Sequence, residues 1–205
     1  MTPLPPAMPT TLTFRGAVGD LPPTAVQPGQ TVAYATEPQN DFQRRMRGTT
    51  TFVREHHASR HGPQLLALMA YIPEGKSARN PEVYQAIPAN LRPGGCYPNS
   101  YARIYWDRPA PTITSNSGTP SSANCIHPAE PRALTIREAA RCQSFRDSYQ
   151  FVGTNSQKRL QIGNAVPPIL AEKLGWTLRA MLDGAATTGT LATQTVANAL
   201  SLESK

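Results

Sequence analysis

Residues 131–168 decide the fold, and they read PRALTIREAARCQSFRDSYQFVGTNSQKRLQIGNAVPP. Two short signatures lie at the two ends of this stretch. In the first, Thr135 and Glu138 form a T-x-x-E capping box, in which each side chain satisfies an amide at the start of a helix. Ala139 and Cys142 follow at helical spacing. We therefore predict a short helix with a narrow apolar stripe and with its arginines elsewhere on the cylinder. Taken alone, such a helix fits any globular domain.

The second signature, QIGNAVPP, ends the stretch. Gly163 and Asn164 suit a tight turn with positive φ. Pro167 and Pro168 suit the first positions of a helix, where a missing amide costs little. We predict that this helix runs to about residue 182 with one apolar face. The residues of that face are Leu170, Leu174, Leu178 and Met181 or Leu182.

Together the two signatures resemble the two C-terminal signature motifs of the DNA cytosine-5 methyltransferases. In that family the first looks like T-x-R-E-A-A-R-x-Q-x-F-P-D-x-Y-x-F-x-G and the second like Q-x-G-N-A-V-P-P. The match extends from Thr135 to Pro168, at the separation the family has. One departure is that Arg146 stands where the family usually has the proline of Phe-Pro-Asp. We expect this change to be tolerated.

Length and charge are compatible with this resemblance. A chain of 205 residues suits one domain, or one and a half, and its 21 prolines and 14 glycines predict much irregular structure. The 20 basic and 13 acidic residues give a net charge of +7. That charge suits a polyanionic partner, although a solvated basic surface explains it equally well.

The cysteines and the N-terminus indicate an intracellular protein. Cys96, Cys125 and Cys142 are odd in number and contain no C-x-x-C pair, so the sequence predicts neither disulfides nor a zinc site. Neither a secretory signal nor a membrane span is expected. We predict a cytoplasmic location, associated with the nucleoid in a bacterium, or a nuclear one in a eukaryote.

The resemblance implies a mixed α/β fold of α+β type. A small target-recognition domain would be followed by a C-terminal helix that packs on an absent Rossmann-like methyltransferase domain. The expected divisions are residues 1–23 (N-terminal tail and linker), 24–130 (target-recognition region), 131–182 (C-terminal motifs and return helix) and 183–205 (flexible tail).

Periodicity and prolines predict the smaller elements. We expect a helical turn within 14–23, a helix with a basic face over 41–48, an apolar helix within 62–75, turns over 76–100, strands at 101–106 and 112–114, and a loop over 115–123. His57 and His61 have the spacing of a helical metal pair, but no third ligand lies nearby. We therefore expect no metal site.

Seven residues are predicted to contact double-stranded DNA that carries a flipped cytosine. Arginine side chains in a basic stretch suit phosphate contacts, which add affinity without sequence information. By the resemblance, residues 101–114 follow a Y-x-R-x-x-W-D-x-P-x-x-T-I-T pattern, and its Thr-aliphatic pair packs against the backbone of the extruded nucleotide. That pair also fits any buried strand. The predicted DNA-binding residues are Arg44, Arg45, Arg47, Arg103, Thr112, Ile113 and Arg137.

The resemblance also implies S-adenosyl-L-methionine as cofactor. Asn164, Ala165 and Val166 would lie beside its pocket, with Asn164 the best candidate for a direct contact. Thr135, with Glu138 in the capping box, is predicted to be structural. Thr135 and Arg137 would fix the recognition domain against the catalytic domain.

The family's catalytic parts are missing from the sequence. Its reaction takes a cysteine thiolate that attacks carbon 6 of cytosine, a glutamate that holds the ring, and an F-x-G-x-G loop that cradles the cofactor. The chain contains no Pro-Cys-Gln, Glu-Asn-Val or F-x-G-x-G. We therefore assign no catalytic residue, and expect a C-terminal part or split subunit that is inactive without an N-terminal catalytic part. The alternatives are a non-catalytic DNA-binding or regulatory remnant and an unrelated basic domain.

Overall fold

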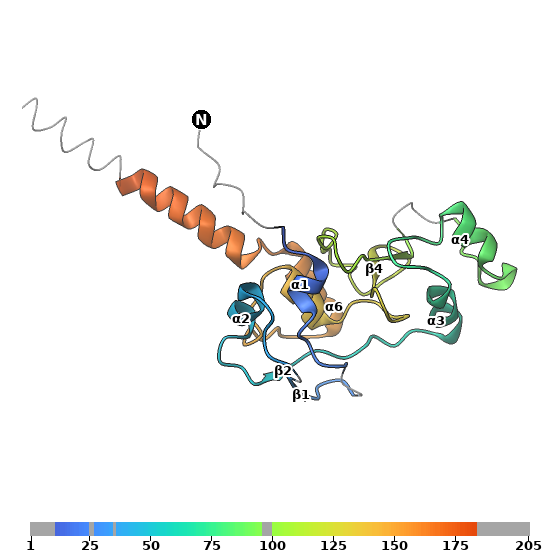
Figure 1. The fold of residues 1–205 in the computed structure, drawn as a ribbon, viewed down its shortest axis with the longest axis horizontal. Coiled ribbons are helices and arrows are strands. Elements are labelled where there is room, and N and C mark those ends of the chain that lie inside the picture. Colours follow the sequence, from blue (N-terminus) through green and yellow to red (C-terminus); the bar gives the residue numbers. More distant parts are fainter. Residues whose placement is uncertain (1–10, 25–26, 35, 96–99, 184–205) are drawn as a thin grey trace, which may run out of the picture. The chain divides into compact units, whose positions relative to one another are not determined.

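A computed structural model of the chain describes residues 11–24, 27–34, 36–95 and 100–183 (Figure 1). The chain divides into two compact units, and the boundary between them falls between Val166 and Pro167. The first unit holds all the labelled helices and strands. The expected boundary at residue 130 is not where the structure divides, and the expected domains remain a prediction. The 183–205 tail lies outside the described residues beyond Asp183.

The helices of the first unit are short, and each begins at a recognisable signal. Thr13 and Asn40 cap α1 and α2 with side-chain oxygens, while α3 and α4 have proline in the first turn. The elements are α1 (Phe14–Val18), α2 (Asp41–Arg47), α3 (Pro63–Ala70), α4 (Pro81–Ala86), the 3₁₀ turn η1 (Ala89–Leu91), α5 (Ile136–Cys142) and α6 (Asn155–Asn164). The predicted helices near residues 14, 41 and 63 are therefore confirmed.

Within the described residues, two two-stranded sheets complete this unit, and the predicted mixed α/β class is confirmed. Strands β1 (Val32–Ala33) and β2 (Phe52–Val53) pair antiparallel, with Val32 opposite Val53. Strands β3 (Ala102–Arg103) and β4 (Asn124–Ile126) pair parallel with a register irregularity. The described strands are thus far shorter than ordinary ones.

Two predictions about residues 76–114 are wrong. The strand expected at 112–114 is irregular chain, and β3 pairs with β4. The preceding Pro109 and Pro111 have no amide to donate to a ladder, which disfavours a strand there. The turns expected over 76–100 contain α4, because Pro81 follows Asn80 as the first residue of a helix rather than breaking one.

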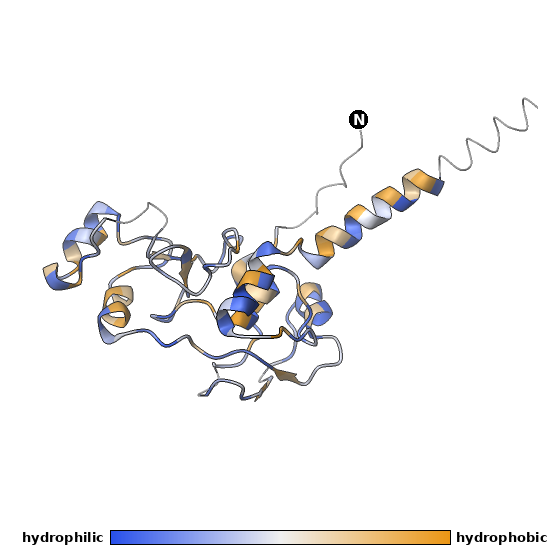
Figure 2. Cartoon of the chain, turned by 180° about the vertical axis from the view of Figure 1, so that it is seen from behind, coloured by the Kyte–Doolittle hydropathy of each residue, from blue (hydrophilic) through white to orange (hydrophobic). Residues whose placement is uncertain are grey.

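Two apolar clusters stabilise the first unit. The larger one is built on α1, α5 and the end of α6, and includes Phe14, Leu134 and Ile162, all fully buried. The smaller one holds α3 and α4 together through Met69 and Ile87. Figure 2 shows α3 as a mainly hydrophobic helix, in agreement with the apolar helix predicted within residues 62–75.

Helix α5 begins at the predicted capping box. The Thr135 side chain accepts from the amide of Glu138, and the Glu138 side chain accepts from the amide of Thr135. The prediction of a narrow apolar stripe is wrong, because the helix is buried all round. Arg137 and Arg141 are both 0% exposed, so the charges of this helix lie inside the protein.

Helix α6 corrects the prediction for Gly163 and Asn164. Both residues belong to the last turn of this helix, and Gly163 does not have a positive φ. The helix begins at a second capping box, in which Thr154 and Gln157 exchange hydrogen bonds. The T-x-x-Q pattern of residues 154–157 is a local sequence signal for the start of this helix.

The described part of the second unit is a helix over residues 168–183, which confirms the predicted start at the double proline. In Figure 2 hydrophobic and hydrophilic residues alternate along it. Its leucines are exposed by 38–68%: Leu170, Leu174, Leu178 and Leu182. Among the described residues, no helix has both the length and the apolar character needed to cross a membrane.

Candidate nucleic-acid and cofactor site

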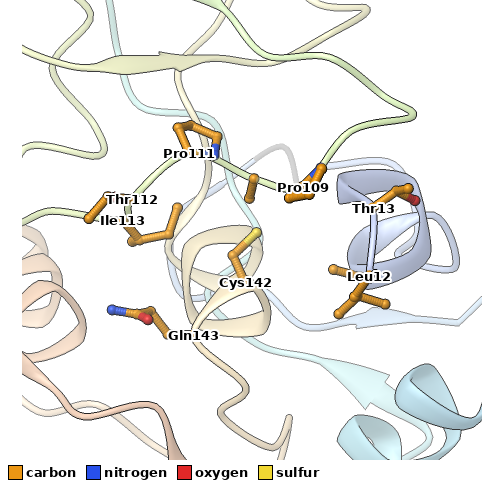
Figure 3. A pocket seen from close by; sticks show the side chains of 10 residues that line it. Leu12, Thr13, Pro109, Pro111, Thr112, Ile113, Cys142 and Gln143 are labelled. Atoms are coloured by element: carbon orange, nitrogen blue, oxygen red, sulfur yellow. The ribbon is translucent and has the colours of Figure 1, made fainter. Parts of the chain in front are cut away.

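A cavity of about 410 Å³ lies beside the predicted Thr-aliphatic pair (Figure 3). Thr112 and Ile113 form one wall, and the C-terminal end of α5 forms another through Cys142 and Gln143. Figure 3 shows the Cys142 sulfur directed toward the segment that carries Pro109 and Pro111. Thr112 is exposed whereas Ile113 is buried. The exposed polar side chain of Thr112 therefore lies next to the buried apolar side chain of Ile113.

The predicted cofactor residues lie at the end of α6, close to this pair. Gly163, directly before Asn164, faces the backbone of Thr114 and Ser115. Asn164 and Val166 are exposed and Ala165 is half-buried. The structure thus brings the predicted cofactor residues and the predicted nucleotide-contacting pair to one region of the first unit.

The three arginines of α2 have different surroundings. Arg44 is exposed and pairs with Asp41, and Arg45 is also exposed. Arg47 is only 10% exposed; it donates to the Asp20 carboxylate at 3.0 Å, and its guanidinium carbon lies 3.7 Å from the centroid of the Tyr34 ring. Arg44 and Arg45 are therefore placed for contact with a polyanion, whereas Arg47 is largely engaged within the protein.

Arg103 is buried, and its guanidinium is surrounded by backbone carbonyls. Burial lowers the pKa of this group, and carbonyls at the end of α3 help to compensate its charge. The acceptors are the carbonyl oxygens of Met69, Ile72, His127, Pro128 and Glu130, at 2.5–3.3 Å. This geometry favours a structural role over the predicted phosphate contact.

Arg137 is likewise enclosed. Its guanidinium donates to the carbonyls of Arg54, Arg146 and Tyr149 at 3.1–3.2 Å. It thereby ties α5 to the segment after β2 and to the turn after α5. The departure from Phe-Pro-Asp is accommodated here, because Arg146 is exposed and only its carbonyl is used.

Thr135 and Glu138 do more than start α5. Thr135 lies 3.0 Å from Nδ1 of His56, whose Nε2 lies 2.8 Å from the carbonyl of Pro22. Because a carbonyl only accepts, Nε2 carries the proton and the threonine hydroxyl donates to Nδ1. Glu138 receives a two-pronged hydrogen bond from Arg132, with both distances 2.8 Å. The pKa of Glu138 is held well below its usual range by this neighbour.

A buried charge cluster surrounds Arg141, and it was not predicted from the sequence. Its guanidinium donates to Asp147 on one side and to Asp20 on the other, and all three side chains are 0% exposed. Tyr34 donates to Asp147 and completes the cluster. The one available signal was an arginine next to the apolar positions of a capped helix. It did not reveal partners as distant in sequence as Asp20.

None of the described cysteines or histidines has the setting of a nucleophile or a metal ligand. Burial raises the pKa of the Cys125 thiol to about 12, and burial together with Glu138 raises that of Cys142. Both thiols therefore disfavour the reactive thiolate. Within residues 11–24, 27–34, 36–95 and 100–183, no three His, Cys, Asp or Glu side chains group as a metal site would require.

Stability is expected to fall as the pH drops below about 6.5. Burial lowers the pKa of all four histidines, His56, His57, His61 and His127, from an ordinary value of 6.5. As the pH falls, the histidines of the unfolded chain therefore bind protons before those of the folded chain. The stability that the neutral histidines contribute above pH 6.5 is lost as the pH falls toward their lower folded pKa values. Glu130 and Glu138, also with lowered pKa values, extend the loss below pH 4.5.

Urea unfolding between pH 8 and pH 5 measures this effect. Each histidine that titrates only in the unfolded chain adds a slope of up to about 1.4 kcal/mol per pH unit. His127→Gln removes one of these groups, so the variant is expected to show a smaller slope than the parent. A free energy of unfolding that stays constant over this range would contradict the prediction.

Comparisons with known proteins identify the family. The family of C-5 cytosine-specific DNA methylases matches residues 13–179. The chain is 33% identical over 191 residues to DNA (cytosine-5)-methyltransferase 4 of Arabidopsis thaliana, covering 83% of the chain and 12% of that protein. It is 36% identical over 171 residues to the type II methyltransferase M.DdeI of Desulfomicrobium norvegicum, covering 77% of the chain and 40% of that protein.

The fold agrees with these matches. A crystal structure from E. coli, described as a DNA modification methyltransferase encoded within a prophage, superposes with a TM-score of 0.63 at 22% identity. The superposition covers 87% of this chain and 49% of that one. The chain spans half or less of each of these relatives. It belongs to the C-5 cytosine-specific DNA methylase family.

Proposed function

We propose that this chain is the target-recognition and C-terminal part of a DNA cytosine-5 methyltransferase. The assembled enzyme transfers a methyl group from S-adenosyl-L-methionine to carbon 5 of a cytosine in a specific DNA sequence. The chain contributes the DNA-facing surface and one edge of the cofactor site. A catalytic part that carries the nucleophilic cysteine and the main cofactor loop completes the enzyme.

The observation that carries this proposal is the exposed leucine face of the helix over residues 168–183, directly after QIGNAVPP. A row of leucines exposed by 38–68% is typical of a surface that another domain covers. The same chain lacks Pro-Cys-Gln, Glu-Asn-Val and F-x-G-x-G. A methyltransferase catalytic domain supplies both the missing motifs and a cover for the leucines.

The residues at the end of α6 fit an edge of a cofactor site rather than a whole one. Asn164 is exposed at the helix end, and no hydrogen bond to another described residue engages its amide. It can therefore donate to or accept from a polar group of S-adenosyl-L-methionine, while Ala165 and Val166 offer apolar contact. Bound there, the cofactor supplies the electrophilic methyl group.

The predicted DNA-binding residues whose side chains are exposed are the candidates for direct contact with DNA. We propose that Arg44 and Arg45 contact phosphate and that Thr112, on the support of Ile113, contacts the backbone beside the flipped cytosine. Arg47, Arg103 and Arg137 hold these elements in place instead. Direct phosphate contact by these three would require their internal hydrogen bonds to be exchanged.

Complementation tests the proposal. The chain alone is expected to transfer no tritiated methyl group to DNA, and co-expression with an N-terminal part bearing the three missing motifs is expected to restore transfer. The matched control is the same N-terminal part with its Pro-Cys-Gln cysteine replaced by serine. Methyl transfer by the purified chain alone would refute the proposal.

The alternative is a DNA-binding or regulatory module without a role in catalysis. It predicts sequence-dependent DNA binding that weakens steeply with salt, and no gain of activity on mixing. The intact QIGNAVPP segment favours the methyltransferase part, because a pure DNA reader has no use for a cofactor-side segment.

A further inference from the structure

Helix α6 and the loop after the Thr-aliphatic pair are locked together at Gly163. A Cβ atom on this residue would lie 2.6 Å from the carbonyl carbon of Thr114 and 2.9 Å from Cα of Ser115. The obstructing atoms are backbone, so they cannot swing away as a side chain would. Since Gly163 has an ordinary helical φ, glycine is needed here for space and not for conformation.

Arg159 makes the second contact, one helical turn earlier on the same face of α6. It is buried, and its guanidinium donates to the hydroxyl of Ser117 at 3.2 Å and to the carbonyl of Leu134 at 2.9 Å. A Cβ atom on Gly118 would lie 2.4 Å from Cζ and Nε of the same guanidinium. Among the described residues no carboxylate pairs with Arg159, so these contacts hold a buried cation in place.

The two contacts join the segments that carry the two predicted ligand groups. Residues 112 and 113 lie directly before the loop. Residues 164–166 lie at the C-terminal end of α6 and directly after it. The packing between them is continuous, because Ile113 and Ile162 belong to the same buried cluster. Gln143 adds a hydrogen bond to the carbonyl of Ile162 at 3.1 Å. We call Arg159, Gly163 and residues 114–118 the α6–loop joint.

We propose that Arg159 and Gly163 are positioning residues, which couple cofactor contact at Asn164–Val166 to nucleotide contact at Thr112 and Ile113. This inference rests on the proposed function for its two ligands. Because backbone meets backbone at Gly163, a displacement of one segment displaces the other. Binding at one site then changes affinity at the other, and the coupling is reciprocal.

Hydrogen exchange on the chain itself tests the joint. Gly163→Ala and Arg159→Lys are expected to speed exchange of the amides of residues 112–118 by about tenfold or more, while α4 keeps its protection. Gly62→Ala is the matched control, because its φ is −66° and a Cβ there meets nothing within 4 Å. Unchanged exchange over residues 112–118 in both joint variants would overturn the proposal.

The assembled enzyme tests the coupling. Bisulfite sequencing of DNA from complemented cells gives the target site, and a duplex with that site is the DNA probe. The affinity for S-adenosylhomocysteine is measured with and without the duplex. The parent and Gly62→Ala are expected to bind about 5- to 150-fold more tightly with DNA, and both joint variants to lose most of this factor.

The outcomes separate the two proposals. A retained coupling factor in the joint variants, with affinity lost equally for both ligands, means ordinary structural damage and overturns the inference. A parent that never transfers a methyl group refutes the proposed function instead. In that case the exchange experiment still decides whether the joint exists.

Discussion

Arg141→Ala is expected to lower the free energy of unfolding by about 3–5 kcal/mol, because it removes the cation that two buried carboxylates share. The Arg141 guanidinium lies 2.5 Å from one oxygen of Asp147 and 3.0 Å from one oxygen of Asp20, and all three side chains are fully buried. Asp20 keeps Arg47 as a partner, whereas among the described residues the Asp147 carboxylate keeps Tyr34 and the more distant Arg137 at 3.9 Å. Urea unfolding followed by circular dichroism measures the loss.

The matched control is Arg44→Ala. Arg44 also pairs with an aspartate, Asp41, but the two side chains are 58% and 97% exposed. Exposed pairs contribute about 0–1 kcal/mol, so this variant is expected to unfold almost as the parent does. Arg141→Lys retains the charge without the two-pronged geometry and is expected to fall in between. Equal stability of Arg141→Ala and Arg44→Ala would contradict the burial argument.

Arg103→Met is expected to unfold the region of α3 and β3, with a loss of about 3 kcal/mol or more. Five carbonyls lose this donor at once. The carbonyls of Met69 and Glu130 still accept from backbone amides, whereas each buried acceptor left without any partner costs about 1–3 kcal/mol. Methionine fills much of the volume, so the loss reports the hydrogen bonds more than a cavity. Thermal unfolding of the chain measures it.

The same variant distinguishes a structural Arg103 from one that binds phosphate. A phosphate-binding arginine would leave the melting transition unchanged and would reduce the slope of log affinity against log salt by about one. We expect the reverse: a lower transition temperature and, at temperatures where the variant is folded, an unchanged salt slope. Arg45→Ala is the control, because an exposed arginine of α2 is expected to change the salt slope without changing the melt.

The sequence by itself determined the family and the starts of two helices. Thr135 and Glu138 form a capping box four residues long, and the helix over residues 168–183 follows Pro167 and begins at Pro168. These signals could be used without a structure, because hydrogen bonds and steric limits at helix starts involve residues close in sequence. The T-x-x-Q capping box of α6 is equally local, so the start of this helix was also predictable from the sequence.

Only the tertiary structure decided where the charges of α5 lie. A helix with two arginines and a short apolar stripe predicts a half-buried position, yet Arg137 and Arg141 are enclosed. Their acceptors come from distant segments: Asp20 lies 121 residues from Arg141, and Arg54 lies 83 residues from Arg137. A buried cation is tolerable only where such partners converge, and spacing along one helix carries no information about that.

The role of Gly163 was decided in the same way. Its neighbours in sequence suggested a turn, and its φ shows a helix. The reason for glycine is the backbone of Thr114 and Ser115, which lies against α6 from a segment nearly 50 residues earlier. The sequence thus determined which residues begin these helices, while the packing of distant segments determined which residues come together at the candidate site.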